Sequence, residues 1–143
     1  MATSHEHKDL VRIMRQWIES NDLFKYFMNR FDLPDDLAPK ALSTINEDGI
    51  ASIPDYAGYS NDGKYCALGE AKTEFRGQTI YDKRADRQLR AYMKWLTYYD
   101  DSLLLIAVPN NHVRIAKLDV RTISKEIGFQ GEILYFNFDG LVQ

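Results

Sequence analysis

The sequence has little of several features that would place it in a specialised class of protein. It contains one cysteine, Cys66, in 143 residues, which excludes an intrachain disulfide and a multi-cysteine metal site and favours a reducing, intracellular setting. It has no apolar run of membrane-spanning length, and its polar first residues are unlike a signal peptide, so we expect a cytoplasmic protein without membrane contact. The formal net charge is −3, so any nucleic-acid binding must come from local charge.

The remaining composition is that of an ordinary globular protein. Hydrophobic residues make up 45% and charged residues 27% of the chain. A chain of this length can bury a core without disulfides. Because no repeat or linker divides it, residues 1–143 are expected to form a single domain.

The spacing of apolar residues predicts helices and strands in alternation. Helices are predicted over residues 4–31, with a break near residues 20–22, and over residues 79–99. Short paired strands are predicted within residues 41–57, broken at residues 46–49, and a further strand over residues 64–72 follows the turn at residues 61–63. Residues 102–109 form a continuous apolar run, which is typical of a strand buried on both faces.

The sequence pattern in the last part of the chain predicts a smaller αβ unit. Residues 112–118 are expected to form a strand, Asp119 to cap a short helix that ends at Gly128, and residues 132–138 to form the last strand. The predicted fold class is therefore α/β (α+β), a central mixed β-sheet flanked by helices. The expected order is α-β-β-β-α-β plus a short αβ tail.

Three charged residues stand out at the second predicted hairpin. Strand side chains alternate, so Glu70 and Lys72 share one face, and the turn at residues 61–63 folds Asp55 back opposite residues 68–70. Two carboxylates are suitable ligands for Mg²⁺ or Mn²⁺, and a nearby lysine can orient a water and offset charge on a phosphate. The pattern predicts metal-assisted hydrolysis of a phosphodiester; the alternative is an exposed Glu–Lys pair beside a turn aspartate.

The helix predicted over residues 79–99 adds an amide and a basic stripe. Gln88 lies on the apolar face, where it needs a polar partner unless it reaches solvent at the rim of the core. Residues 70–94 carry seven basic side chains against four acidic ones, which could hold a phosphate backbone or could form a solvated face of ion pairs. The candidate nucleic-acid contacts are Arg76, Lys83, Arg87, Arg90, Tyr92 and Lys94.

These motifs carry a family resemblance. Pro54-Asp55, then fourteen residues, then Glu70-Ala71-Lys72 resembles the PD-(D/E)XK signature of the restriction-endonuclease-like nucleases. Gln88 and Tyr92 are similar to the QxxxY motif of the RecB and λ-exonuclease branch. The expected order of helices and strands is similar to the common core of that superfamily.

The resemblance implies a metal-dependent nuclease. Asp55, Glu70 and the backbone carbonyl of Ala71 would hold one or two Mg²⁺ or Mn²⁺ ions. Lys72 would position the attacking water, and Gln88 would orient the lysine, the water or a phosphate, with Tyr92 packed behind it.

Many members of the superfamily add an acidic ligand from the first helix. The candidate here is Glu19, with Glu6 as the alternative. His5 and His7 resemble a metal-binding pair, but their place near the terminus favours a disordered polar end.

DNA is the favoured substrate, although the acidic net charge departs from that of small, strongly basic relatives. A homodimer or a partner protein that supplies DNA binding is therefore expected. The alternatives are a catalytically inactive nuclease-fold module for binding or assembly, and a small hydrolase that acts on another phosphoester.

Overall fold

The computed structural model describes residues 5–20, 45–47, 50–52, 54–59, 64–73 and 83–142. This part of the chain contains three α-helices and a five-stranded mixed sheet, which confirms the predicted mixed α/β class. The helices are α1 (His5–Ser20), α4 (Lys83–Leu96) and α5 (Val113–Ile127), and a short 3-10 helix, η2 (Asn110–His112), precedes α5.

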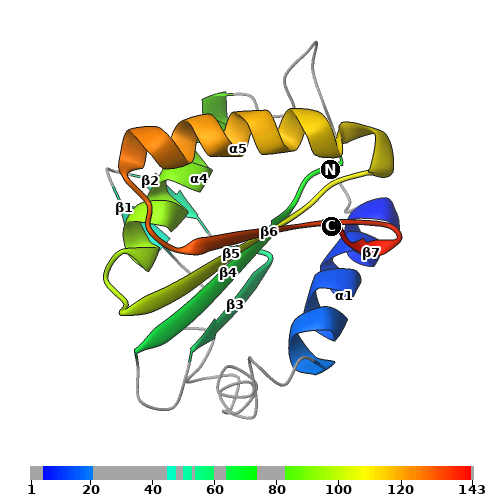
Figure 1. The fold of residues 1–143 in the computed structure, drawn as a ribbon, viewed down its shortest axis with the longest axis horizontal. Helices are drawn as coiled ribbons and strands as arrows, with labels where there is room; N and C mark the ends of the chain where they lie inside the picture. The colour runs from blue at the N-terminus through cyan, green and yellow to red at the C-terminus, as the bar shows by residue number, and fades with distance from the viewer. Residues whose placement is uncertain are drawn as a thin grey trace.

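The sheet contains parallel and antiparallel pairs in the order β3-β4-β5-β6-β7 (Figure 1). Its strands are β3 (Tyr56–Tyr59), β4 (Tyr65–Ala71), β5 (Asp101–Ala107), β6 (Glu132–Asn137) and β7 (Gly140–Leu141). The β4–β5 and β5–β6 pairs are parallel, whereas β3 and β7 pair antiparallel with β4 and β6. A separate antiparallel pair is formed by β1 (Ile45–Glu47) and β2 (Ile50–Ser52).

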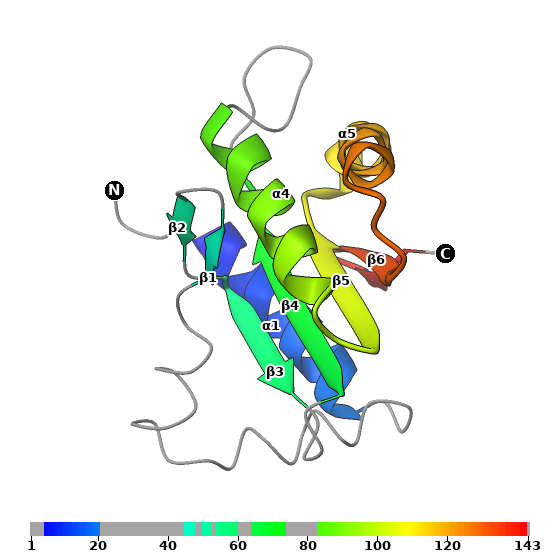
Figure 2. The same cartoon turned by 90° about the vertical axis from the view of Figure 1, so that its left-hand side faces the viewer.

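Helices cover both faces of the sheet. Figures 1 and 2 show α1 on one face and α4 and α5 on the other. Because side chains alternate along a strand, β5 supplies two cores: Leu104 and Ile106 pack in the cluster with α4 and α5, and Leu103 and Leu105 in the cluster with α1. This two-sided burial explains the continuous apolar run predicted from the sequence.

The helix α1 packs through three side chains at helical spacing. Leu10, Met14 and Ile18 are completely buried, and burial of each contributes about 1.5–3 kcal/mol of hydrophobic free energy. The strand β4 meets this helix at Gly69, where a Cβ atom would lie 3.3 Å from Met14 Sδ and 3.1 Å from Tyr56 Cβ. Glycine therefore allows a close approach of α1 to the sheet.

The prediction of a strand over residues 112–118 is wrong, because these residues form η2 and the start of α5. The alternating Val113 and Ile115 suggested a period of two, but the buried residues of α5 are Ala116, Val120 and Ile123, at helical spacing. Leu118, the last residue of the expected strand, is 59% exposed. Asp119 consequently lies inside α5 and does not cap a helix.

Other boundaries agree with the sequence. The helix α1 ends at Ser20, at the predicted break, and residues 21–31 of the predicted first helix lie outside the described residues. Gly128 ends α5 in a left-handed conformation with φ 76°, and its N–H donates to the carbonyl of Ser124. The last strand, β6, lies within the predicted residues 132–138.

The region between α1 and α4 contains more strands than predicted. Three strands were expected, and the described residues of this region form four, of which β3 and β4 join the five-stranded sheet. In the described part of the chain, no helix is both long and apolar enough to cross a membrane.

Candidate metal-dependent hydrolytic site

The candidate site lies where β4 ends, beside the start of β3. The antiparallel register pairs Tyr56 with Gly69, so Asp55 falls opposite Glu70, as the sequence predicts. The residues of the expected turn, 61–63, lie outside the described residues. The antiparallel pairing of β3 with β4 brings together two carboxylates that have fourteen residues between them in the sequence.

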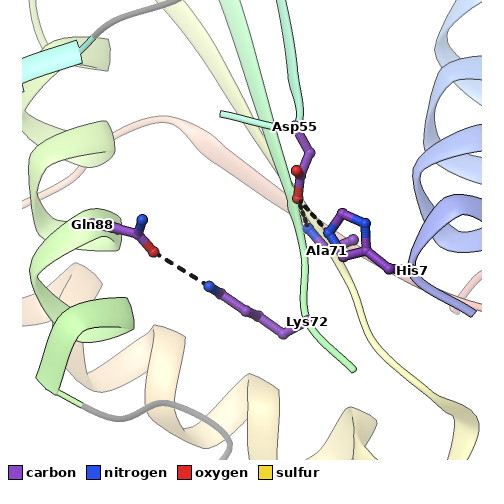
Figure 3. Close-up of polar contacts among 5 residues, drawn as sticks. All are labelled: His7, Asp55, Ala71, Lys72 and Gln88. Carbon is purple, nitrogen blue, oxygen red and sulfur yellow. Dashed lines mark hydrogen bonds and ion pairs between the residues drawn. The ribbon is translucent and has the colours of Figure 1, made fainter. Parts of the chain in front are cut away.

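Asp55 is held by two hydrogen bonds to its Oδ2 atom (Figure 3). The backbone N–H of Ala71 donates to Oδ2 over 2.9 Å. His7 Nε2, from the first turn of α1, lies 3.2 Å from the same oxygen. These bonds fix the position of the carboxylate at the edge of β4, between the sheet and α1.

Glu70 is a buried carboxylic acid. Its side chain is 6% exposed, on the same face as Cys66 and Leu68, which pack in the cluster with α4. Burial raises its pKa well above the usual range, the hydrogen bond and charge of Asp55 raise the pKa further, and the charge of Lys72 and a hydrogen bond with Tyr92 oppose this. Among the described residues, Oε2 of Glu70 has no hydrogen-bond partner.

Lys72 continues the same face and reaches α4. Its Nζ donates to Oε1 of Gln88 over 3.3 Å (Figure 3). Its backbone N–H donates to the carbonyl of Ala107 over 2.9 Å, so β5 fixes the main chain at this point. The half-buried Gln88 amide thus has a polar partner, as its place on the apolar face of the helix required.

The donor set is chemically suited to a hard cation. A buried carboxylate oxygen without a hydrogen bond, next to a second carboxylate, is a suitable ligand for Mg²⁺ or Mn²⁺. Within the described ranges, no group of three or more His, Cys, Asp or Glu side chains is arranged to hold a metal ion. Water and substrate oxygens would therefore complete the coordination, as is common for Mg²⁺.

The acidic ligand predicted from α1 stays a prediction. The side chain of Glu19 lies outside the described part of the chain, and Glu6 is exposed. His7 lies next to Asp55, although its place near the terminus predicted a disordered polar end. The available signal was its spacing: His7 precedes the buried Leu10 and Met14 by three and seven residues, so it lies on the inner face of the helix.

The residues of the predicted basic stripe on α4 differ in their exposure and in their ion pairs. Arg90 pairs with Asp86 at 2.8 Å and with Glu126 of α5 at 2.5 Å, so its charge is balanced within the protein. Lys83 and Arg87 are exposed, whereas Lys94 is half-buried.

Two further candidate contacts do not lie on a described surface. Tyr92 lies on the inner face of α4 and is completely buried. This burial is consistent with packing behind Gln88 but leaves no surface for contact with a nucleic acid. Arg76 lies outside the described residues.

Comparison with known proteins gives no match: no family model, no curated protein and no solved structure is significantly similar to this chain.

Proposed function

We propose that this chain is a metal-dependent nuclease of the restriction-endonuclease-like type, which hydrolyses phosphodiester bonds in DNA. The observation that carries the proposal is the convergence of Asp55, Glu70, Lys72 and Gln88 at the end of β4. An antiparallel hairpin followed by a helix and a parallel strand is consistent with the common core of these nucleases.

The proposed ligands of Mg²⁺ or Mn²⁺ are Asp55, Glu70 and the carbonyl of Ala71. When bound, the ion supplies Lewis-acid activation of water and of a phosphate oxygen. The Ala71 N–H orients Asp55 from the main chain, so this carboxylate is fixed before substrate arrives. Glu70 provides a carboxylate whose burial favours binding of a cation over solvation by water.

Lys72 is the proposed positioning group for the attacking water. Its ammonium has three donors, and the bond to Gln88 uses one of them while fixing the direction of the side chain. The remaining donors are available for a water and for a non-bridging phosphate oxygen, whose charge increases in the transition state. Gln88 acts through Lys72 and is a positioning residue.

The alternative function is that of an inactive nuclease-fold module for binding or assembly, acting as a homodimer or with a partner protein. The buried Glu70 argues against it. A buried carboxyl oxygen that lacks a hydrogen bond, such as Oε2 of Glu70, destabilises the fold by about 1–3 kcal/mol. A role in packing alone does not explain this cost. A small hydrolase of non-nucleic phosphoesters would use the same residues and differs only in substrate.

The test is DNA cleavage with Mg²⁺ or Mn²⁺, measured on single-stranded, duplex and branched DNA and on RNA. Asp55→Asn retains an oxygen to accept the Ala71 N–H, and Lys72→Met retains the length of the side chain, so both are expected to fold. Each is expected to lower the cleavage rate by about 10²-fold or more.

The matched controls are Asp100→Asn and Lys125→Met, which change exposed residues away from the site and are expected to cleave like the wild type. Cleavage by Asp55→Asn and Lys72→Met at the wild-type rate would exclude the proposal. A thermal shift with Mn²⁺ that depends on Asp55, without cleavage of any substrate, would favour the binding module.

A further inference from the structure

A basic cavity beside α1 adjoins the candidate site. The cavity has a volume of about 500 Å³, and its lining includes Asp55 and His7 together with Lys8, Arg12 and Arg15. Asp55, the proposed metal ligand, therefore forms part of its wall. A molecule that fills this cavity would contact Asp55, whereas Glu70, Lys72 and Gln88 are not part of the lining.

The cations of the cavity follow the helix axis. Lys8, Arg12 and Arg15 are spaced by four and three residues, which places them in one row on α1. At 1.5 Å per residue the row extends for about 10 Å. Because one strand of DNA rises about 3.4 Å per nucleotide, the row matches about three nucleotide steps.

The charge balance of the cavity favours an anion. Three cations line it against one carboxylate, Asp55. Arg12 also pairs with Asp9 at 3.2 Å, but both side chains are more than half exposed, and such pairs contribute little. Arg15 also interacts within the protein, and Arg90 on α4 has two carboxylate partners.

We infer that the row Lys8, Arg12 and Arg15 on α1 binds the phosphate backbone of the nucleic-acid strand that enters the site. The inference rests on the proposed function, because the proposed cleavage site at Asp55 decides in which direction the nucleic-acid strand runs along the row. It assigns the principal phosphate-binding surface to α1, and the stripe on α4 contributes at most Lys83 and Arg87. Binding through this row reads no base sequence, since phosphates position a strand without specifying it.

The test measures binding separately from cleavage. Fluorescence anisotropy of labelled single-stranded DNA, duplex DNA and RNA is recorded in EDTA between 50 and 200 mM salt, which are about the conditions where phosphate contacts are resolved. The triple variant Lys8→Ala, Arg12→Ala, Arg15→Ala is compared with Arg114→Ala, Arg121→Ala, Lys125→Ala. The second set removes the same charge from exposed positions of α5, on the opposite face of the sheet.

The α1 variant is expected to lose about tenfold or more in affinity at low salt. The slope of log K against log salt should fall by about 0.7–0.9 for each lost contact, whereas the α5 variant should keep the wild-type slope. Equal loss in both variants would mean that net charge alone governs binding, and would overturn the inference. Absence of binding by the wild type would overturn it as well.

Cleavage of the same DNA with Mn²⁺ separates this inference from the proposed function. If the wild type and the α1 variant cleave the DNA with the same KM, the proposal of an α1 phosphate-binding surface is overturned, whereas the proposal of nuclease activity is supported. Binding that depends on α1 without cleavage supports the surface and excludes the nuclease. Circular dichroism of both triple variants establishes that their folds are retained.

Discussion

At the scale of single residues, Glu70 places function and stability in opposition. A carboxyl group at 6% exposure, facing Asp55, favours its neutral form. A cation would reverse this preference because it stabilises both carboxylates at once. The same residue is thus unfavourable for the metal-free fold and favourable for the metal-bound one.

We predict that Glu70→Gln stabilises the metal-free protein. Because the folded-state pKa is raised, stability from the protonated acid is present below the pKa of an unfolded glutamate, about 4.3, and is lost as pH rises toward the folded-state pKa. The variant has no such loss, so at pH 7 in EDTA its free energy of unfolding should exceed that of the wild type by about 1–3 kcal/mol. Urea unfolding from pH 4 to pH 8 measures the difference.

The same variant should lose the stabilisation that Mn²⁺ gives to the wild type. A glutamine that lowers stability in EDTA at pH 7, with no effect of pH on the difference, would contradict the assignment of Glu70 as a buried acid. Asp139→Asn changes an exposed carboxylate and serves as the control for loss of one charge.

His7 controls the orientation of Asp55 from a different element. Groups that orient a metal ligand alter affinity about 10–100-fold when they are removed. We therefore predict that His7→Ala weakens Mn²⁺ binding by about tenfold, measured as the metal concentration that gives half of the thermal shift. His5→Ala changes an exposed neighbour two residues away and should bind Mn²⁺ like the wild type; equal affinity in both variants would exclude the role of His7.

At the scale of elements, the contact of α1 with β4 depends on Gly69. We predict that Gly69→Val destabilises the protein by about 1–3 kcal/mol, because a Cβ atom there lies 3.1 Å from Tyr56 Cβ and further methyl groups overpack the interface. Urea unfolding measures this cost.

A double-mutant cycle with Met14→Ala tests the location of the strain. The alanine removes Met14 Sδ, which lies 3.3 Å from the added Cβ, so the cost of Gly69→Val should be smaller in that background. An unchanged cost would place the strain elsewhere in the hairpin.

At the scale of the whole molecule, the features that the sequence predicts are those that depend on a few neighbouring residues. The alternation in β4 places Glu70 and Lys72 on one face, and the period of α4 places Gln88 toward the sheet. Both predictions need a window of a few residues. The hairpin that pairs Asp55 with Glu70 is likewise a short-range feature.

The missed features depend on partners far along the chain. The bond between His7 and Asp55 joins residues 48 apart; the helical spacing places His7 on the inner face of α1 but does not identify Asp55 as its partner. At the start of α5, Val113 and Ile115 have the two-residue spacing of a strand, whereas the residues that pack against the sheet have helical spacing. The separation of β1 and β2 from the main sheet also depends on tertiary contacts.

The position of α1 in the chain has a consequence for the order of folding during synthesis. This helix is translated before every strand that it covers, and its cluster includes Leu105 of β5 and Phe136 of β6. Its apolar face therefore has no complete partner until Phe136, which lies 118 residues after Ile18, has left the ribosome. Because α1 carries His7, we expect the contact of His7 with Asp55 to become stable only after β5 and β6 have been made.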